Sequence, residues 1–144
     1  MKYLLDTDHM SILQWRTGPA FTTLTERMAP HPRTDLAFSI ISLHEQTRGC
    51  HAYLQRARTG RELVHGYSLL TQVLRDFTIA PVLPFDDAAA TVFARLVAQR
   101  LRVRTMDLRI AAIALARGLI VLTRNASDFG RVPGLQIDDW TVEI

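Results

Sequence analysis

Residues 2–8 read Lys-Tyr-Leu-Leu-Asp-Thr-Asp, a short apolar strand that ends abruptly in acidic residues. The same change from apolar to acidic recurs three times: Glu45 and Asp128 each follow an apolar run, and Asp107 opens an alanine-rich helix. In an open parallel sheet the carboxyl ends of the strands share one edge, and ligands bind there. We therefore expect Asp6 and the three later acids to converge at one site.

Apolar runs of strand length alternate with segments of helical periodicity along the chain. Strands are expected at residues 2–5, 36–40, 79–85, 119–123, 135–138 and 141–144. Helices are expected at residues 10–15, 20–28, 42–54, 61–77, 88–100 and 108–117. Pro81 and Pro84 make the third strand short or place it at a sheet edge. The alternation predicts a three-layer α/β/α sandwich with a mainly parallel sheet, in which residues 1–144 form a single domain.

The composition narrows the class of protein. Apolar residues make up 48% of the chain and charged residues 22%, and no apolar run approaches the ~20 residues of a membrane span. Residues 1–6 reach an acidic residue too early for a signal peptide, and the single cysteine, Cys50, cannot form an internal disulfide. These features favour a cytoplasmic protein.

The net charge of +3 comes from 16 arginines and one lysine set against 14 acidic residues. If several of the acids gather in one pocket, the remaining surface is more basic than the total indicates. A basic rim around an acidic pocket suits a phosphodiester substrate. The alternative is that the arginines reflect codon composition and cover an ordinary solvated surface.

Each acid also has a purely structural explanation. Asp6 is a natural helix N-cap, and residues 42–45 (Ser-Leu-His-Glu) match a capping box that would account for Glu45. Asp107 would favour the positive end of its helix dipole, and Asp128 would cap the turn formed by residues 127–130. Taken singly, none of the last three acids requires a catalytic role.

The four acids together favour a metal site. Two carboxylates about 4 Å apart repel by roughly 4 kcal/mol at an effective dielectric constant of 20. A convergent set therefore needs a cation, and Mg²⁺ or Mn²⁺ takes oxygen ligands of this kind. Thr7, Thr123 and Asn125 are placed to orient the carboxylates or a water molecule.

In their order and spacing, these segments resemble the PIN-domain ribonucleases, and most closely the VapC-type toxins of VapBC toxin–antitoxin pairs. The resemblance covers nearly the whole chain. It rests on residues 4–7 (Leu-Leu-Asp-Thr), 42–45 with Gly49, 106–112 (Met-Asp-Leu-Arg-Ile-Ala-Ala), 122–125 (Leu-Thr-Arg-Asn), 128–129 (Asp-Phe) and 132–135 (Val-Pro-Gly-Leu).

The resemblance implies an endoribonuclease that depends on Mg²⁺ or Mn²⁺, with Asp6, Glu45, Asp107 and Asp128 as its acidic site. Asp6 and Asp107 would bind the metal directly, while the other two complete its sphere or act through water. Metal-activated water would attack a phosphodiester and leave a 3′-hydroxyl and a 5′-phosphate. The family also implies a homodimer and a cognate antitoxin that wraps the toxin and obstructs its pocket.

Two residues depart from the family pattern. Asp8 stands where many relatives carry asparagine or another neutral polar residue, so it adds a fifth carboxylate, and Met106 is bulkier than expected beside Asp107. The arginines expected to guide RNA are Arg100, Arg102, Arg104, Arg109 and Arg124. The expected partner surfaces are the segment around Trp15 and Phe21 and the helix at residues 61–77.

Two other functions fit part of the pattern. A haloacid-dehalogenase-type phosphatase also has Asp-x-Asp after a strand, as in residues 6–8, and a threonine after a later strand, as at Thr123. That mechanism needs a lysine downstream, whereas the only lysine here is Lys2. A binding module with a vestigial pocket would bind RNA or a protein partner, but the presence of all four acids argues against decay.

Overall fold

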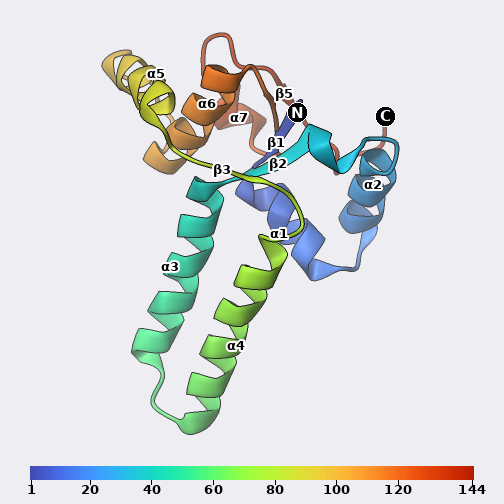
Figure 1. The fold of residues 1–144 in the computed structure, drawn as a ribbon, viewed down its shortest axis with the longest axis vertical. Helices are drawn as coiled ribbons and strands as arrows, with labels where there is room; N and C mark the ends of the chain where they lie inside the picture. The colour runs from blue at the N-terminus through green and yellow to red at the C-terminus, as the bar shows by residue number, and fades with distance from the viewer.

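The computed structural model describes residues 1–144, and its centre is a five-stranded sheet in the order β3-β2-β1-β4-β5 (Figure 1). All four strand pairs are parallel. The strands are β1 (Tyr3–Leu5), β2 (Leu36–Ser39), β3 (Val82–Leu83), β4 (Ile120–Leu122) and β5 (Ile137–Asp138). The prediction that the strand with two prolines is short or lies at an edge is confirmed on both counts, because β3 has two residues and ends the sheet.

Helices cover both faces of the sheet, so the predicted three-layer sandwich is confirmed. They are α1 (Thr7–Trp15), α2 (Pro19–Met28), α3 (Ile40–Arg56), α4 (Gly60–Asp76), α5 (Asp87–Ala98), α6 (Thr105–Arg117) and α7 (Ala126–Phe129), with a 3₁₀ turn at Arg33–Asp35. In Figure 1, α5, α6 and α7 lie on one side of the sheet, and α1 and α2 lie on the other. No helix is both long and apolar enough for a membrane crossing.

Two hydrophobic cores sit on the two faces of the sheet. Leu4 and Leu5 are adjacent and fully buried, but Leu4 packs with α5, α6 and α7, whereas Leu5 packs with α1, α2 and α4. Successive side chains of a strand point to opposite faces, so both must be apolar when both faces are covered. This explains why the strands are continuous apolar runs rather than alternating ones.

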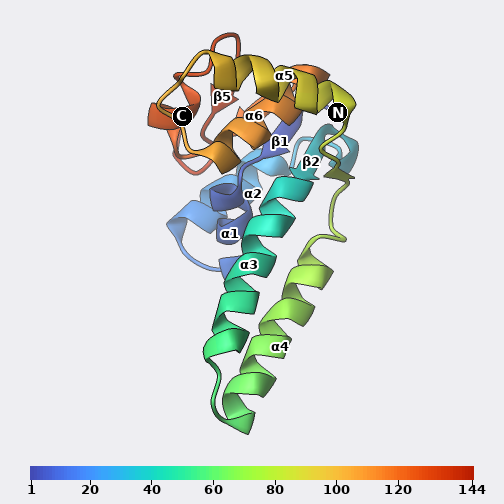
Figure 2. The same ribbon diagram turned by 90° about the vertical axis from the view of Figure 1, so that its left-hand side faces the viewer.

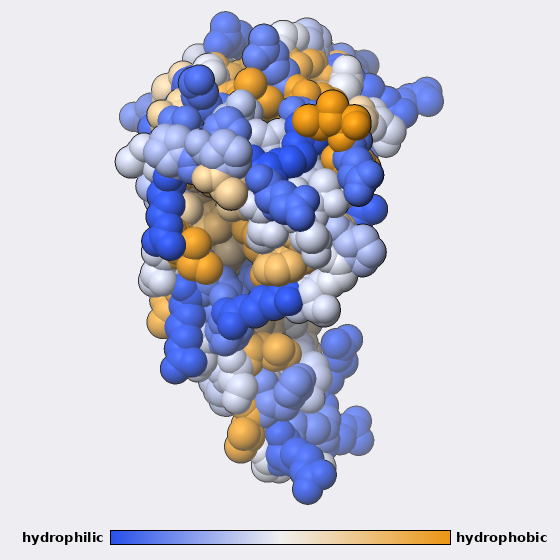
Figure 3. Space-filling model, turned by 90° about the vertical axis from the view of Figure 1, so that its right-hand side faces the viewer, coloured by the Kyte–Doolittle hydropathy of each residue, from blue (hydrophilic) through white to orange (hydrophobic).

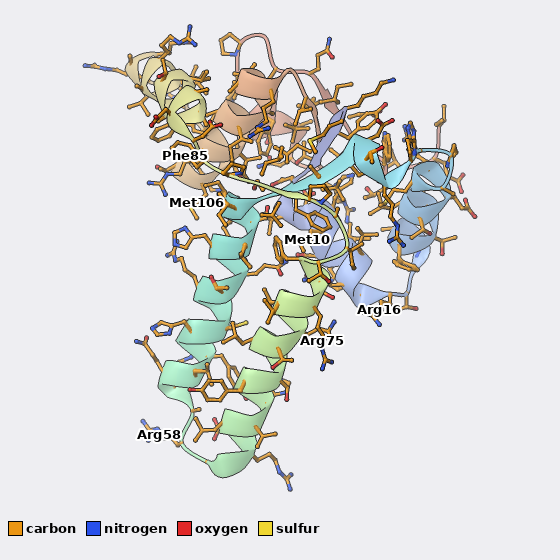
Figure 4. All side chains as sticks on the ribbon, in the orientation of Figure 1. Met10, Arg16, Arg58, Arg75, Phe85 and Met106 are labelled. Carbon is orange, nitrogen blue, oxygen red and sulfur yellow. The ribbon has the colours of Figure 1, made fainter.

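Helices α3 and α4 form an antiparallel pair that extends away from the sheet (Figure 2). Each has 17 residues, about 25 Å of helix. Gly66 permits their close approach, because a Cβ atom there would collide with the side chain of Leu54. Figure 4 shows Arg58 at the far tip of this hairpin and Arg75 near the body.

Several expected element boundaries were wrong. The helix expected from residue 42 begins at Ile40, and its N-cap is Ser39, whose hydroxyl accepts the Ser42 N–H at 3.1 Å. Glu45 therefore lies in the second turn of α3, and the capping-box explanation for it fails.

The C-terminal end of the chain also differs from the prediction. The strand expected at residues 141–144 does not form, because the Asp139 carboxylate accepts both the N–H and the hydroxyl of Thr141 and holds a turn there. The helix expected from Leu108 starts earlier, at Thr105, and α7 is capped by Asn125 rather than by Asp128.

Candidate functional site

Asp6 lies at the carboxyl end of the central strand, where its carboxylate is buried and held by hydrogen bonds. The residue is 5% exposed and is the N-cap of α1. Its Oδ1 accepts the Thr7 N–H at 2.7 Å, and its Oδ2 accepts the Thr123 hydroxyl at 2.8 Å. Because Thr123 directly follows β4, the two central strands fix this carboxylate together.

Asp8 adds a second carboxylate one residue into α1. Its Oδ2 accepts the Arg124 N–H at 2.9 Å and lies 3.3 Å from the Thr123 hydroxyl oxygen, which also accepts the Asn125 N–H at 2.9 Å. Its Oδ1 lies 2.8 Å from Nδ1 of His9. His9 is fully buried, and its Nε2 accepts the Trp140 N–H, so Nδ1 carries the proton that is donated to Asp8.

A chain of hydroxyl groups connects Glu45 to the end of β2. The Thr7 hydroxyl donates to Oε1 of Glu45 at 2.9 Å and lies 2.9 Å from the Ser42 hydroxyl. The Ser39 hydroxyl donates to Ser42 at 3.4 Å. Because each hydroxyl has one proton, Ser39 donates to Ser42, Ser42 to Thr7, and Thr7 to Glu45. The side chain of Glu45 is thus directed toward the N-terminus of α1.

Asp107 and Asp128 complete the acidic group from the other side of the sheet. Asp107 is 1% exposed in the first turn of α6, and Asn125 joins it to Asp128 through its amide, at 3.5 Å and 3.2 Å. Arg104 forms a fork on Asp107, with Nε 3.1 Å from Oδ2 and an η-nitrogen 3.3 Å from Oδ1. Arg131 lies 3.5 Å from Asp128.

The carboxylates influence one another's ionisation. Burial, the Asp8 charge and the Asp107 charge raise the pKa of Asp6 to about 7, against the hydrogen bonds from Thr123 and Thr7. Burial also raises the pKa of Asp107. The hydrogen bond and charge of Arg104 partly offset this rise in pKa, and the charge of Asp128 adds to it. Burial would raise the pKa of Asp8 too, but hydrogen bonds from His9 and the Arg124 N–H hold it below the ordinary value.

This donor set fits a hard cation by its chemistry. It consists of carboxylate oxygens with hydroxyl and amide groups behind them, which are ligands for Mg²⁺ or Mn²⁺ rather than for softer metals. Burial first, and then the charge of Asp8, raises the pKa of Asp6, and a bound cation would oppose both effects. However, no group of three His, Cys, Asp or Glu side chains is arranged to hold a metal ion as it stands. The cation paired with Asp107 is Arg104.

The structure brings the predicted acidic and polar residues together at one edge of the sheet. Hydrogen bonds and charge coupling connect Asp6, Thr7, Asp8, Glu45, Asp107, Thr123, Asn125 and Asp128. Met106 lies near the N-terminal turns of α3, against which α6 packs (Figure 4).

Of the five predicted RNA-contacting arginines, only Arg104 contacts a site carboxylate through its side chain. Arg124 does so through its backbone N–H, and its side chain is exposed. Arg109 turns toward α5, where its guanidinium lies 5.7 Å from the centre of the Phe93 ring. Arg100 and Arg102 are exposed in the connection before α6, without ion pairs.

Sequence reasoning missed three residues of this site. Arg131 stands three positions after Asp128, a spacing that signals a contact on a helical turn. Ser39 was available as a helix cap at the end of an apolar strand. His9 gave no sequence signal, because its partner Trp140 lies 131 positions away.

The fold and this edge define a parallel α/β sandwich with a carboxylate cluster at the carboxyl ends of its central strands. Residues 3–135 match the family model for the PIN domain, and the chain therefore belongs to the PIN domain family.

Curated relatives match part of the chain. A tRNA(fMet)-specific endonuclease VapC of Shigella flexneri is 44% identical over 64 residues, which are 42% of this chain and 48% of that protein. A ribonuclease VapC1 of Rickettsia felis is 37% identical over 60 residues, 39% of this chain and 45% of that protein. The matches thus span about half the length of these curated relatives.

Solved structures match along nearly the whole chain. A DNA-bound VapBC from Salmonella typhimurium has a TM-score of 0.74 at 27% identity, covering 97% of this chain and 98% of that chain. VapBC-1 from nontypeable Haemophilus influenzae has a TM-score of 0.76 at 21% identity, covering 99% of this chain and all of that chain, and supports the fold alone.

Proposed function

We propose that this protein is a metal-dependent endoribonuclease and the toxin of a type II toxin–antitoxin pair. The observation that carries the proposal is the network of five carboxylates at the carboxyl edge of a PIN-domain sheet. The names of the relatives support it, since those proteins are called VapC endonuclease and ribonuclease. Within this proposal the working compartment is the cytoplasm.

Asp6 and Asp107 are the proposed direct ligands of one divalent ion, Mg²⁺ or Mn²⁺, with Glu45 and Asp128 completing its sphere or acting through water. They are the two site acids with almost no exposed surface, so their negative charge is the least compensated by solvent. When bound, such an ion makes water more acidic and neutralises charge that develops on a phosphoryl oxygen.

The remaining residues position these acids. Thr123 holds one oxygen of Asp6, and Thr7 directs Glu45 toward the same pocket. A water molecule oriented by Glu45 would attack phosphorus, the P–O3′ bond would break, and the products would be a 3′-hydroxyl and a 5′-phosphate. Asn125 holds Asp107 and Asp128 at a fixed separation while charge builds up on the phosphate.

RNA would be held by arginines around the acidic edge. Arg100, Arg102 and Arg124 are exposed and make no ion pairs, so their charge is free for phosphates. Arg109, whose guanidinium lies 5.7 Å from the centre of the Phe93 ring, stays a predicted contact of the RNA. The partners implied by this function are an RNA substrate, a cognate antitoxin and a second copy of the chain.

The outer face of α4 is the proposed surface for a protein partner. Val64, Tyr67 and Leu74 are 58–69% exposed on this helix. Figure 3 shows orange, hydrophobic side chains between blue, hydrophilic ones along the lower part of the molecule, where the α3–α4 hairpin lies. The segment around Trp15 and Phe21 is the second proposed partner surface, and Trp15, at the end of α1, is 60% exposed.

The test is cleavage of total cellular RNA by the purified protein, freed of any antitoxin, in Mn²⁺ or in EDTA. Asp6→Asn is assayed beside it, since amide and carboxylate have nearly the same shape. We expect discrete fragments with 5′-phosphates in Mn²⁺ only, and none from the variant. If the wild-type protein binds RNA without cutting it in Mn²⁺, the chain is a binding module instead.

A further inference from the structure

Arg104 occupies an unusual position at the acidic site. It is the sole ion-pair partner of Asp107 and engages both carboxylate oxygens through its Nε and one η-nitrogen. Electrostatic attraction to Glu45 and Asp6, in addition to Asp107, also stabilises the charged form of Arg104. One guanidinium thus provides, from outside, positive charge to three of the carboxylates that were expected to surround a metal ion.

Nothing else in the fold requires the Arg104 side chain. It is 69% exposed, it makes no hydrogen bond other than those to Asp107, and it caps no helix N–H although the residue is the N-cap of α6. Its partner, by contrast, is 1% exposed. The pair therefore joins an exposed cation to a buried anion, and the arginine can leave without disturbing the core.

A metal ion and this arginine cannot use Asp107 in the same way. A divalent ion needs a free oxygen lone pair on the carboxylate and brings its own water molecules with it. The guanidinium fork directs donors at both oxygens.

We propose that Arg104 is a built-in competitor of the divalent ion at Asp107, and that it turns to the phosphate of the RNA when the ion displaces it. The proposal rests on the metal-dependent function proposed above. The planar fork that matches a carboxylate also matches a phosphate, so the freed guanidinium has a second partner in the same pocket. Arg104 is thus a positioning residue that exchanges one anion for another.

The decisive experiment is a Mn²⁺ titration of the purified protein by calorimetry at pH 8, without RNA. Arg104→Gln removes the charge, and Arg104→Lys keeps the charge but not the fork. Arg102→Gln is the matched control, an exposed arginine of the same connection without an ion pair. We expect Arg104→Gln to bind Mn²⁺ roughly fivefold more tightly, the scale of one exposed ion pair, with Arg104→Lys between it and wild type.

Equal or weaker Mn²⁺ binding by Arg104→Gln overturns the competition. If wild type and Arg104→Gln both bind Mn²⁺ measurably and equally, only this inference fails, and the metal-dependent function stands. If neither binds Mn²⁺, both fail. Circular dichroism confirms that each variant is folded before it is titrated.

The contact between the displaced Arg104 and the RNA phosphate is tested by measuring RNA binding in a variant that does not cleave RNA. In Glu45→Gln, we expect Mn²⁺ to strengthen the binding of a short RNA, and in Glu45→Gln with Arg104→Gln we expect most of that strengthening to be lost. An identical response to Mn²⁺ in both proteins would show that the freed guanidinium does not reach the phosphate.

Discussion

The acidic edge of the sheet buries carboxylates, whereas the α3–α4 hairpin exposes apolar side chains. Both differ from the usual distribution of polar and apolar groups. At the edge, Asp6 and Asp107 are at most 5% exposed. On the hairpin, Val64 and Leu74 are 69% and 68% exposed. Carboxylates are rarely buried, and apolar side chains are unremarkable on a surface only when scattered singly.

The two regions differ in the internal contacts that the chain makes with these side chains. Every buried side-chain nitrogen and oxygen atom has a hydrogen-bond partner, and at the edge Arg104 and Arg131 form ion pairs with Asp107 and Asp128. On the hairpin, the apolar side chains of Val64, Tyr67 and Leu74 stay 58–69% exposed. We infer that the edge is prepared for a small, charged ligand and the hairpin for a large, apolar one.

The largest expected effect is on cleavage, from Glu45→Gln. The amide oxygen still accepts the Thr7 hydroxyl, so the fold is kept while the charge and the proton-accepting group are lost. We expect the rate of RNA cleavage to fall by roughly 10²–10⁴-fold, with an unchanged melting temperature. Glu26→Gln, an exposed acid on α2, serves as the control and should cleave normally. Full activity in Glu45→Gln would remove Glu45 from the site.

The next largest effect is on the stability of the metal-free protein, from Asp6→Asn. The pKa of Asp6 is about 7 in the folded protein, above the value near 4 expected when unfolded. Below pH 4 both states are protonated, so there is no penalty. Between pH 4 and pH 7 the unfolded chain loses its proton first, so this group lowers the free energy of unfolding as pH rises, by up to about 4 kcal/mol.

Denaturant unfolding in EDTA at pH 4.5 and at pH 8 measures this effect. Asp6→Asn should be more stable than wild type at pH 8 and gain little at pH 4.5. Glu143→Gln, an exposed acid at the end of the chain, should show no such difference. A gain that is independent of pH would mean that Asp6 is not held in a repulsive, buried cluster.

A smaller effect is expected from Thr123→Val, which removes a hydroxyl but keeps the shape. Asp6 would lose one hydrogen bond and Asn125 would lose the acceptor of its N–H. Residues that orient metal ligands typically contribute about 10–100-fold to metal affinity or activity. We expect a loss of that size, measured as cleavage rate and Mn²⁺ affinity, and recovery in Thr123→Ser. A fully active valine variant would show that the carboxylate is positioned without it.

The smallest effect is expected on the hairpin, where one substitution can be made on both sides of α4. Val64→Thr on the exposed face should change the free energy of unfolding by less than about 0.5 kcal/mol. Val73→Thr on the buried face should lower it by about 1–3 kcal/mol, because a hydroxyl enters an apolar core. Chemical denaturation compares the two. Equal losses would mean that the outer face of α4 is already covered in the isolated protein.

The sequence predicted the architecture because its signals are local. The continuous apolar run at residues 119–123 and the helical periodicity around it are enough to predict β4 and a covered parallel sheet. The convergence of Asp6 with Asp107 followed from topology, since Asp6 ends a strand and Asp107 opens the helix that leads into the next parallel strand, so both lie at the carboxyl edge. That part of the site was predictable without coordinates.

Other features depended on tertiary contacts and were missed. Two serines, Ser39 and Ser42, could cap α3, and the choice follows from Ser39 lying at the end of a buried strand. The ion pair of Arg104 with Asp107 was not predicted, although their three-residue spacing permits it, and the RNA contact of Arg104 stays a prediction. The role of His9 depends on a backbone group of Trp140, which no local pattern shows.

The central position of β1 has a consequence for synthesis of the protein on the ribosome. Its partner β4 pairs Leu4 with Val121, 117 positions later, so the middle of the sheet cannot close until most of the chain has been made. At roughly 5–20 residues per second, that wait lasts on the order of 10 s. Asp107 and Asp128 emerge at the end of the same interval. A nascent or prematurely terminated chain therefore lacks the complete carboxylate cluster until the residues up to Asp128 have been made.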